Sequence, residues 1–215
     1  MLKLELARAG GLRALVLGAH PDDIEIGCGG TILEWCALGR IAAVRWVVLS
    51  GSEPRAREAR DAASAFLDGV AAPEIEVRSF RDGYFPYDGA RIKDAFEDLK
   101  RDVDPDVIFA PRREDLHQDH RLVAELAWNT FRDHVILEYE IPKYDADLGA
   151  PNVFVDLPEE TCLRKVDLLL RCFPSQAGRS WFTADTFRAI LRLRGVESNA
   201  PGGNAEGFTA RKLAV

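Results

Sequence analysis

The sequence predicts an α/β protein of the doubly wound, three-layer α/β/α type with a mostly parallel sheet. Two observations indicate this fold class. Short aliphatic segments alternate with amphipathic ones between residues 14 and 138, and their spacing suits βαβ units. The 215 residues are 47% hydrophobic, which is enough for a substantial core. Because no linker or repeat divides the chain, we expect a single domain over residues 1–215.

The first strand is predicted at residues 14–17, Ala-Leu-Val-Leu, an unbroken aliphatic run of the kind found in strands buried on both faces. A polar turn rich in glycine is expected over residues 18–30. A helix should follow at residues 31–38 and end at Gly39. Residues 41–50 are again aliphatic and predict the second strand.

The same alternation continues to residue 138. The predicted elements are a helix at 54–67, a strand at 74–80, an aromatic-rich loop at 81–88, a helix at 91–101, a strand at 107–110, a polar loop at 111–119, a helix at 120–131 and a strand at 135–138. Right-handed crossovers between such strands place helices on both faces of a Rossmann-like sheet. The last third predicts an irregular helical C-terminal part, with helices at 157–173 and 186–193 and a flexible, glycine-rich stretch at 199–207.

Composition and charge exclude several classes of protein. Acidic residues outnumber basic ones by 35 to 28, and the sequence pI of about 5.2 argues against nonspecific nucleic-acid binding. No apolar run approaches the ~20 residues of a membrane-spanning helix, and residues 1–12 lack the apolar core of a secretion signal. The four cysteines form no C-x-x-C pair. We expect a cytoplasmic protein without membrane insertion, and the sequence leaves a homo-oligomer open.

Three of the four histidines lie beside aspartates in loops that follow predicted strands. The clusters are AHPDD at residues 19–23 and HQDH at residues 117–120. In the common 3-2-1-4 strand order the two preceding strands are neighbours. Both clusters then lie at the carboxyl edge of the sheet, where ligands bind in doubly wound folds. We therefore expect one shared site.

The donor atoms in these clusters suit a divalent metal. His20 and Asp23 are three residues apart, as are His117 and His120, so both members of a pair can point the same way. A catalytic zinc site uses three protein ligands and a water, and two histidines with one aspartate meet that number. The histidine and the carboxylate left over would act as general acid and general base. Metal coordination lowers the pKa of water from about 15.7 to about 7.

Other interpretations of these residues also exist. Asp22 or Asp23 alone would most often cap a helix, and His120 alone would be a surface residue of its helix. Gly27, Gly29 and Gly30 are similar to a nucleotide-binding loop, but they match neither G-x-G-x-x-G nor a P-loop. Nearby carboxylates would also repel a pyrophosphate. We expect the glycines to let the turn pass close to the metal and the sheet.

Residues 19–31, AHPDDIEIGCGGT, resemble the leading motif of the PIG-L/LmbE-like family of zinc-dependent de-N-acetylases. The second motif of that family, usually HPDH, is present here as HQDH. Weaker similarities extend over nearly the whole chain, at Arg55, Glu58, Asp82-Gly83, Ser175-Gln176 and Ala205-Glu206. The resemblance implies a hydrolase that removes the acetyl group from an N-acetylated amino sugar of a small GlcNAc-type conjugate, with metal-bound water as nucleophile.

The resemblance also implies roles for residues of the two motifs. His20, Asp23 and His120 would bind Zn²⁺, with another divalent metal such as Fe²⁺ as an alternative. Asp22 would be the general base. His117 would protonate the leaving amine or stabilise the oxyanion.

The resemblance implies less for the residues around them. Asp119 would orient a histidine, and Arg55 would reach a substrate hydroxyl or charge. Some relatives hold a tyrosine that assists the oxyanion two residues before the first histidine of the second motif, where this chain has Asp115. Tyr84 and Tyr87 are alternative sources of such a group, but we expect them to pack their own loop.

Two further functions fit the same residues. A metal-containing module of this fold would bind a glycan or metabolite without turnover, and a related hydrolase would cleave another amide. The complete set of ligands and base favours the hydrolase. The net charge of −7 weakly disfavours a strongly anionic group on the sugar, a bias that local arginines would override.

Overall fold

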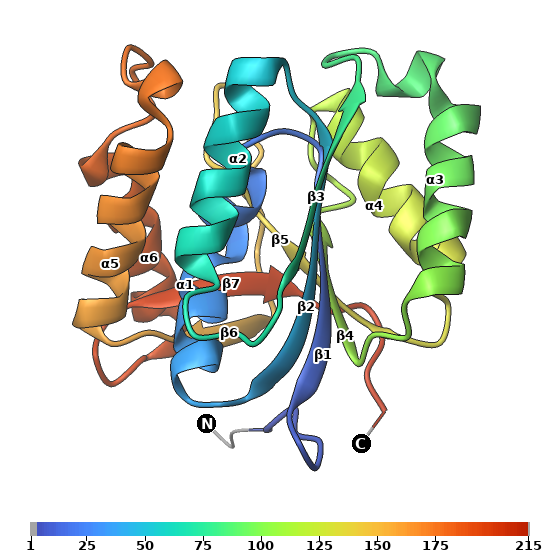
Figure 1. The fold of residues 1–215 in the computed structure, drawn as a ribbon. Coiled ribbons are helices and arrows are strands. Elements are labelled where there is room, and N and C mark those ends of the chain that lie inside the picture. Colours follow the sequence, from blue (N-terminus) through green and yellow to red (C-terminus); the bar gives the residue numbers. More distant parts are fainter. Residues whose placement is uncertain (1–3, 215) are drawn as a thin grey trace.

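A computed structural model of the protein describes residues 4–214, whose elements form a doubly wound α/β fold (Figure 1). The strands in this part of the chain are β1 (Leu12–Gly18), β2 (Ile41–Ser50), β3 (Glu74–Phe80), β4 (Val107–Pro111), β5 (Val135–Tyr139), β6 (Val153–Asp156) and β7 (Ala205–Thr209). The α-helices are α1 (Asp23–Ala37), α2 (Glu53–Phe66), α3 (Gly89–Asp102), α4 (Gln118–Thr130), α5 (Glu159–Cys172) and α6 (Ala184–Ser198), with short 3₁₀ helices η1 (Phe85–Tyr87) and η2 (Pro174–Gln176). The strands predicted at residues 41–50 and 74–80 are confirmed.

The seven strands form one sheet in the order β3-β2-β1-β4-β5-β7-β6. The first five are parallel, and Val16 of β1 lies opposite Trp46 of β2 and Phe109 of β4. β7 runs antiparallel to both β5 and β6. The predicted 3-2-1-4 order is confirmed, so the carboxyl ends of β1 and β4 lie next to each other.

Helices cover both faces of this sheet. In Figure 1, α3 and α4 lie on one side, and α1, α2, α5 and α6 lie on the other. Side chains alternate between the two faces of a strand, and β1 shows this alternation. Leu15 and Leu17 belong to the apolar core under α3 and α4, whereas Ala14 and Val16 belong to the core on the opposite face. Burial on both faces explains why this strand reads as a continuous aliphatic run.

The prediction of a glycine-rich turn up to residue 30 is wrong, because α1 begins at Asp23 and contains Gly27, Gly29 and Gly30. The low helix propensity of glycine is overridden by tertiary packing. A Cβ atom added at the three glycines would collide with neighbouring side chains, namely Tyr139 at 2.1 Å, Phe66 at 2.5 Å and Leu157 at 2.6 Å. These glycines therefore let α1 approach the sheet and its neighbouring helices.

The prediction that residues 199–207 form a flexible stretch is wrong for residues 205–207, because β7 begins at Ala205 inside the sheet. Glu206 is buried and accepts hydrogen bonds from the backbone N–H groups of Gly30 (2.8 Å) and Thr31 (2.7 Å). It also accepts one from Lys165 Nζ on α5 at 2.6 Å. Through these contacts Glu206 joins β7 to both α1 and α5. The C-terminal part thus adds two strands to the predicted helices, of which β7 runs antiparallel to both of its neighbours.

Candidate active site

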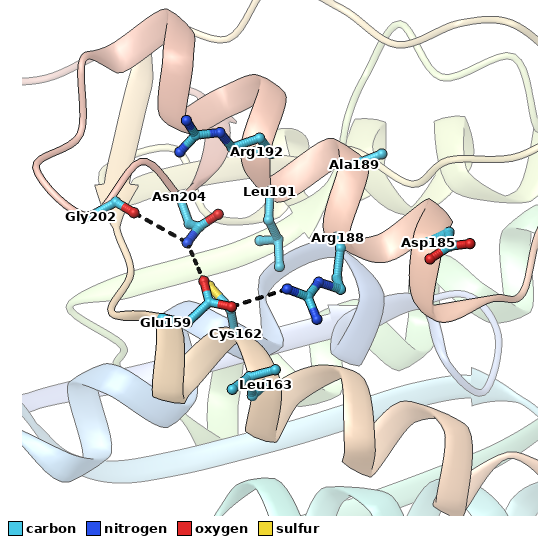
Figure 2. A pocket seen from close by; sticks show the side chains of 10 residues that line it. All are labelled: Glu159, Cys162, Leu163, Asp185, Arg188, Ala189, Leu191, Arg192, Gly202 and Asn204. Carbon is cyan, nitrogen blue, oxygen red and sulfur yellow. Dashed lines mark hydrogen bonds and ion pairs between the residues drawn. The ribbon is translucent and has the colours of Figure 1, made fainter.

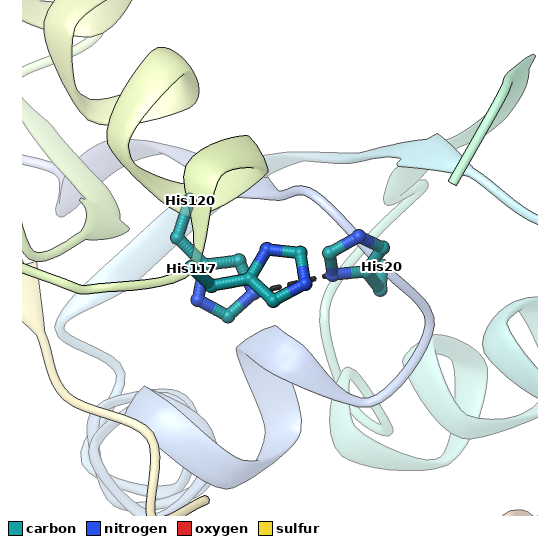
Figure 3. Close-up of side chains that lie close together, drawn as sticks. All are labelled: His20, His117 and His120. Carbon is teal, nitrogen blue, oxygen red and sulfur yellow. Dashed lines mark hydrogen bonds between the residues drawn. The ribbon is translucent and has the colours of Figure 1, made fainter. Parts of the chain in front are cut away.

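The two histidine clusters meet at the carboxyl edge of the sheet. His20 follows β1, whereas His117 and His120 lie at the start of α4, after β4. Because β1 and β4 are neighbours, His20 Nδ1 lies 3.2 Å from His120 Nε2 although the residues are 100 positions apart. Figure 3 shows the three rings converging from the two loops, and their nearest nitrogens all lie within 4.8 Å of one another.

Three donor atoms form a compact triangle at this point. Asp23 Oδ2 lies 3.5 Å from His20 Nδ1 and 3.3 Å from His120 Nε2, and the third side is the 3.2 Å between the imidazole nitrogens. Ligands that bind a tetrahedral zinc ion at about 2.0–2.1 Å are about 3.3–3.4 Å apart. The residues present therefore fit a divalent metal of this size.

Each candidate histidine ligand is held by a buried carboxylate at its other nitrogen. His20 Nε2 lies 3.1 Å from Asp119 Oδ2, and His120 Nδ1 lies 3.0 Å from Asp115 Oδ2. With the ring proton on the nitrogen that faces the carboxylate, the other nitrogen directs its lone pair into the triangle. Asp82 also lies 3.1 Å from His20 Nε2. The group of His20, Asp82 and Asp119 offers only one imidazole nitrogen, so the triangle is the better metal site.

The charges around the triangle stabilise a cation. Burial lowers the pKa of His20 and the pKa of His120. The negative charges of Asp23 and the flanking carboxylates outweigh this effect, so both pKa values are raised, that of His120 to about 9. Burial likewise raises the pKa of Asp23, but the two histidines outweigh it and hold this pKa well below its usual value. The site therefore favours positive charge, carried either by the imidazoles or by a metal that replaces their protons.

Asp22 lies beside the triangle in a strained backbone conformation. Its φ of 94° is in the left-handed region, and its side chain makes no cap hydrogen bond to α1, although it occupies the N-cap position. Its Oδ2 instead accepts a hydrogen bond from Arg55 at 3.0 Å. Burial raises the pKa of Asp22 to about 7, with Arg55 opposing the rise and Asp23 adding to it. A carboxyl group with a pKa in this range suits proton transfer near neutral pH.

His117 is fixed by a backbone hydrogen bond at one nitrogen. Its Nδ1 accepts from the N–H of Asp119 at 3.3 Å, so it caps α4, and the proton of the neutral ring lies on Nε2. Its ring centre lies 4.8 Å from that of His20 and 4.6 Å from that of His120. Burial lowers the pKa of His117, and the positive charge of the other two histidines lowers it further. His117 is thus a neutral N–H donor next to the triangle.

Arg55 lies on α2, with both terminal nitrogens bound to protein groups. One donates to the carbonyl of Pro21 and to Asp22, and the other donates to Glu58 and Ser175, each at 3.1 Å. The structure therefore places Arg55 beside the predicted general base. Its contact with a substrate hydroxyl stays a prediction.

A family model matches this chain over residues 15–131, more than half of its length, and that range contains both histidine clusters. The model is that of PIG-L, described as GlcNAc-PI de-N-acetylase. The chain belongs to the PIG-L family. A curated relative, the uncharacterized deacetylase YaiS of Escherichia coli strain K12, is 31% identical over 159 residues, which cover 68% of this chain and 82% of the relative. The PIG-L protein described here is therefore a member of a deacetylase family.

Solved structures share the fold over almost the entire chain. N,N′-diacetylchitobiose deacetylase from Pyrococcus horikoshii is 24% identical, with a TM-score of 0.71, over 92% of this chain and 83% of that one. The conserved protein TT1542 from Thermus thermophilus is 22% identical, with a TM-score of 0.71, over 95% and 96%. GalB, the 4-carboxy-2-hydroxymuconate hydratase from Pseudomonas putida KT2440, is 20% identical, with a TM-score of 0.75, over 94% and 97%. At these identities the likeness shows a shared fold.

Asp115 is a site residue whose role the sequence did not reveal. Besides holding the ring of His120, its carboxylate accepts from the backbone N–H of His117 at 2.8 Å and from Lys143 Nζ at 2.9 Å. Lys143 also contacts both carboxylate oxygens of Asp147, at 2.7 and 2.8 Å. An aspartate five residues before a histidine carries no distinctive spacing, and Lys143 comes from the segment after β5. Only the fold brings them together.

Replacing Asp115 by asparagine should weaken zinc binding by about 10- to 100-fold, the usual cost of losing a carboxylate that orients a metal-binding histidine. Competition with a chromophoric zinc chelator measures this affinity. Glu114→Gln is the matched control, because Glu114 is the neighbouring acid and its side chain is 56% exposed. Wild-type zinc affinity in Asp115→Asn would contradict the orienting role.

Tyr84 and Tyr87 contact groups of their own loop, because their ring centres are 6.0 Å apart and Arg81 lies over Tyr84. The two residues stay 43% and 80% exposed, whereas Phe85 is buried. The loop is also fixed by Asp119, which accepts from the N–H of Gly83 at 2.7 Å and of Phe85 at 3.1 Å. Asp119 therefore contacts both His20 and the loop beside it. Its role in orienting the histidine stays a prediction.

A cavity of about 410 Å³ lies elsewhere, between α5, α6 and the start of β7 (Figure 2). Three of its polar residues are joined, because Glu159 contacts both Arg188 (3.2 Å) and Asn204 (2.8 Å). None of the four histidines lines it, so it is separate from the histidine clusters. In the described part of the chain, no helix is both long and apolar enough to cross a membrane.

Proposed function

We propose that this PIG-L protein is a metal-dependent hydrolase that removes the acetyl group from an N-acetylated amino sugar of a small conjugate. The observation that carries the proposal is the triangle of His20 Nδ1, His120 Nε2 and Asp23 Oδ2, with Asp22 next to it. Family membership supports deacetylation as the reaction. The metal dependence and the sugar substrate are the parts that the proposal adds.

His20, Asp23 and His120 would hold a divalent ion, for which zinc suits the two nitrogens and one oxygen. When bound, this ion would polarise the acetamide carbonyl and acidify a water molecule. Asp115 and Asp119 keep the two histidine rings in the orientation that this requires.

Asp22 takes the proton of the attacking water on its carboxylate. Arg55 holds Asp22 Oδ2 at 3.0 Å and limits the rise in its pKa caused by burial, so that the carboxylate can still accept this proton. Asp22 then returns the proton to the leaving amine. The Nε2–H of His117 donates to the oxygen of the acetamide as negative charge develops there, because its Nδ1 is already used as an acceptor. Asp22 would thus transfer the proton of the water, and His117 would donate a hydrogen bond to the oxyanion, so both motif residues outside the ligand set have a role.

Acetate release from N-acetylglucosamine glycosides tests the proposal. We expect release by the protein as purified, loss of most of it after removal of the metal with a chelator, and recovery on addition of one equivalent of Zn²⁺ or Fe²⁺. Recovery by one of the two ions identifies the metal that works. Tight binding of the glycosides without acetate release would instead support the binding module, and release that a chelator leaves unchanged would exclude metal dependence.

A further inference from the structure

The turn that follows β3 holds an arginine that has no ionic partner among the described residues. Residues 81–84 form a turn in which the N–H of Tyr84 donates to the carbonyl of Arg81 at 3.2 Å and Gly83 has a φ of 76°. The guanidinium carbon of Arg81 lies 3.5 Å from the centre of the Tyr84 ring. Within residues 4–214, this guanidinium makes no hydrogen bond or ion pair with another residue. Its five N–H donors are therefore available.

This turn lies next to the candidate active site. Asp82, the residue after Arg81, reaches His20 Nε2 at 3.1 Å. Gly83 donates to the buried Asp119, which itself contacts His20. The turn is thus fixed directly to a candidate metal ligand, and Arg81 projects from a rigid base. A rigid turn favours binding, because ordering a mobile loop would cost part of the binding free energy of its contacts.

Stacking orients the Arg81 side chain for recognition of an anion. A guanidinium that lies over an aromatic ring keeps its N–H groups in its own plane, where they match the two oxygens of a carboxylate or phosphate. Arg55 cannot play this part, because Pro21, Asp22, Glu58 and Ser175 occupy its terminal nitrogens. The negative charge of Asp82 next to Arg81 is directed toward His20.

We propose that Arg81, stacked on Tyr84, binds a carboxylate or phosphate on the group attached to the amino sugar. The inference rests on the proposed deacetylase function and names the chemistry that its substrate would carry. It reverses the weak expectation, based on net charge alone, of a substrate without a strong anion. A cation next to the substrate outweighs the net charge of the protein, because interactions between exposed charges are screened beyond about 10 Å.

Three glycosides of N-acetylglucosamine test this proposal. The group attached to the sugar is methyl in the neutral one, and carboxymethyl or phosphoethyl in the two anionic ones. Their dissociation constants are measured by calorimetry on Asp22→Asn protein, so that binding is read without turnover. We expect this protein to prefer at least one charged glycoside over the neutral one by about tenfold, the usual contribution of a charge-assisted hydrogen bond. The Arg81→Gln change should abolish that preference, and added salt should reduce it.

Arg91→Gln is the matched control. Arg91 lies nearby over Phe80, is paired with Asp88 at 2.9 Å, and its removal changes the net charge equally. We expect it to keep the preference for charged glycosides. Binding of the charged glycosides no tighter than the neutral one, or a preference that survives in Arg81→Gln, would overturn the proposal. Acetate release from the neutral glycoside by the wild type reports on the proposed function separately. The carboxymethyl and phosphoethyl arms show which anion is preferred.

Discussion

Replacing Asp22 by asparagine should lower kcat by a factor of about 10²–10⁴, the usual contribution of a general base, while the protein keeps its metal. The amide cannot take a proton from water, but it can still accept the hydrogen bond from Arg55. Asparagine also tolerates the left-handed backbone at this position, where φ is 94°. The loss should therefore reflect chemistry and not misfolding. Acetate release at saturating substrate, with metal analysis and thermal unfolding of the same sample, measures it.

The control for this substitution is Asp145→Asn, which makes the same chemical change at an exposed position outside the site. It should leave kcat and the metal content unchanged. An Asp22→Asn protein that turns over at the wild-type rate would remove Asp22 as the base. A variant that has lost its metal would indicate instead that Asp22 helps to hold the ion.

Replacing His120 by alanine should abolish stable metal binding and, with it, acetate release. The substitution removes one of three donor atoms that lie 3.2–3.5 Å apart and leaves Asp115 without its ring partner. Loss of an outer partner costs about 10- to 100-fold in metal affinity, so the loss of a direct ligand should exceed about 100-fold. His20→Ala should behave in the same way. Metal content after gel filtration and zinc competition titration measure both variants.

His134 provides the matched control, because it is the one histidine of the chain outside the two motifs. Its Nε2 lies 3.8 Å from Asp104, and its side chain is 23% exposed. His134→Ala should retain wild-type metal content and activity. If His120→Ala and His134→Ala bind zinc equally well, the proposed ligand set is incorrect.

The parallel half of the fold was predictable from the sequence because its strands are buried on both faces. Residues 41–50 and 74–80 read as strands and are strands, and loops after successive strands must meet at one edge of a parallel sheet. The helix that begins at Asp23 was missed because its glycines disfavour a helix locally. Contacts with Tyr139, Phe66 and Leu157 decide its course. β7 was missed because AEGFT is short, and its pairing depends on strands about 50 and 70 residues earlier.

The sequence by itself predicted the residue types of the candidate site and their grouping, since imidazole and carboxylate groups suit a divalent metal and the strand order brings their loops to one edge of the sheet. The tertiary structure alone decided which atom faces which. It turned Asp115 toward His120, bound Arg55 to Asp22, and placed Arg81 on Tyr84 with no ionic partner in the described part of the chain. These contacts either join separate elements, as Arg55 and Asp22 do, or depend on local turns. Side-chain orientation follows from packing and competition for hydrogen-bond partners, which residue spacing does not encode.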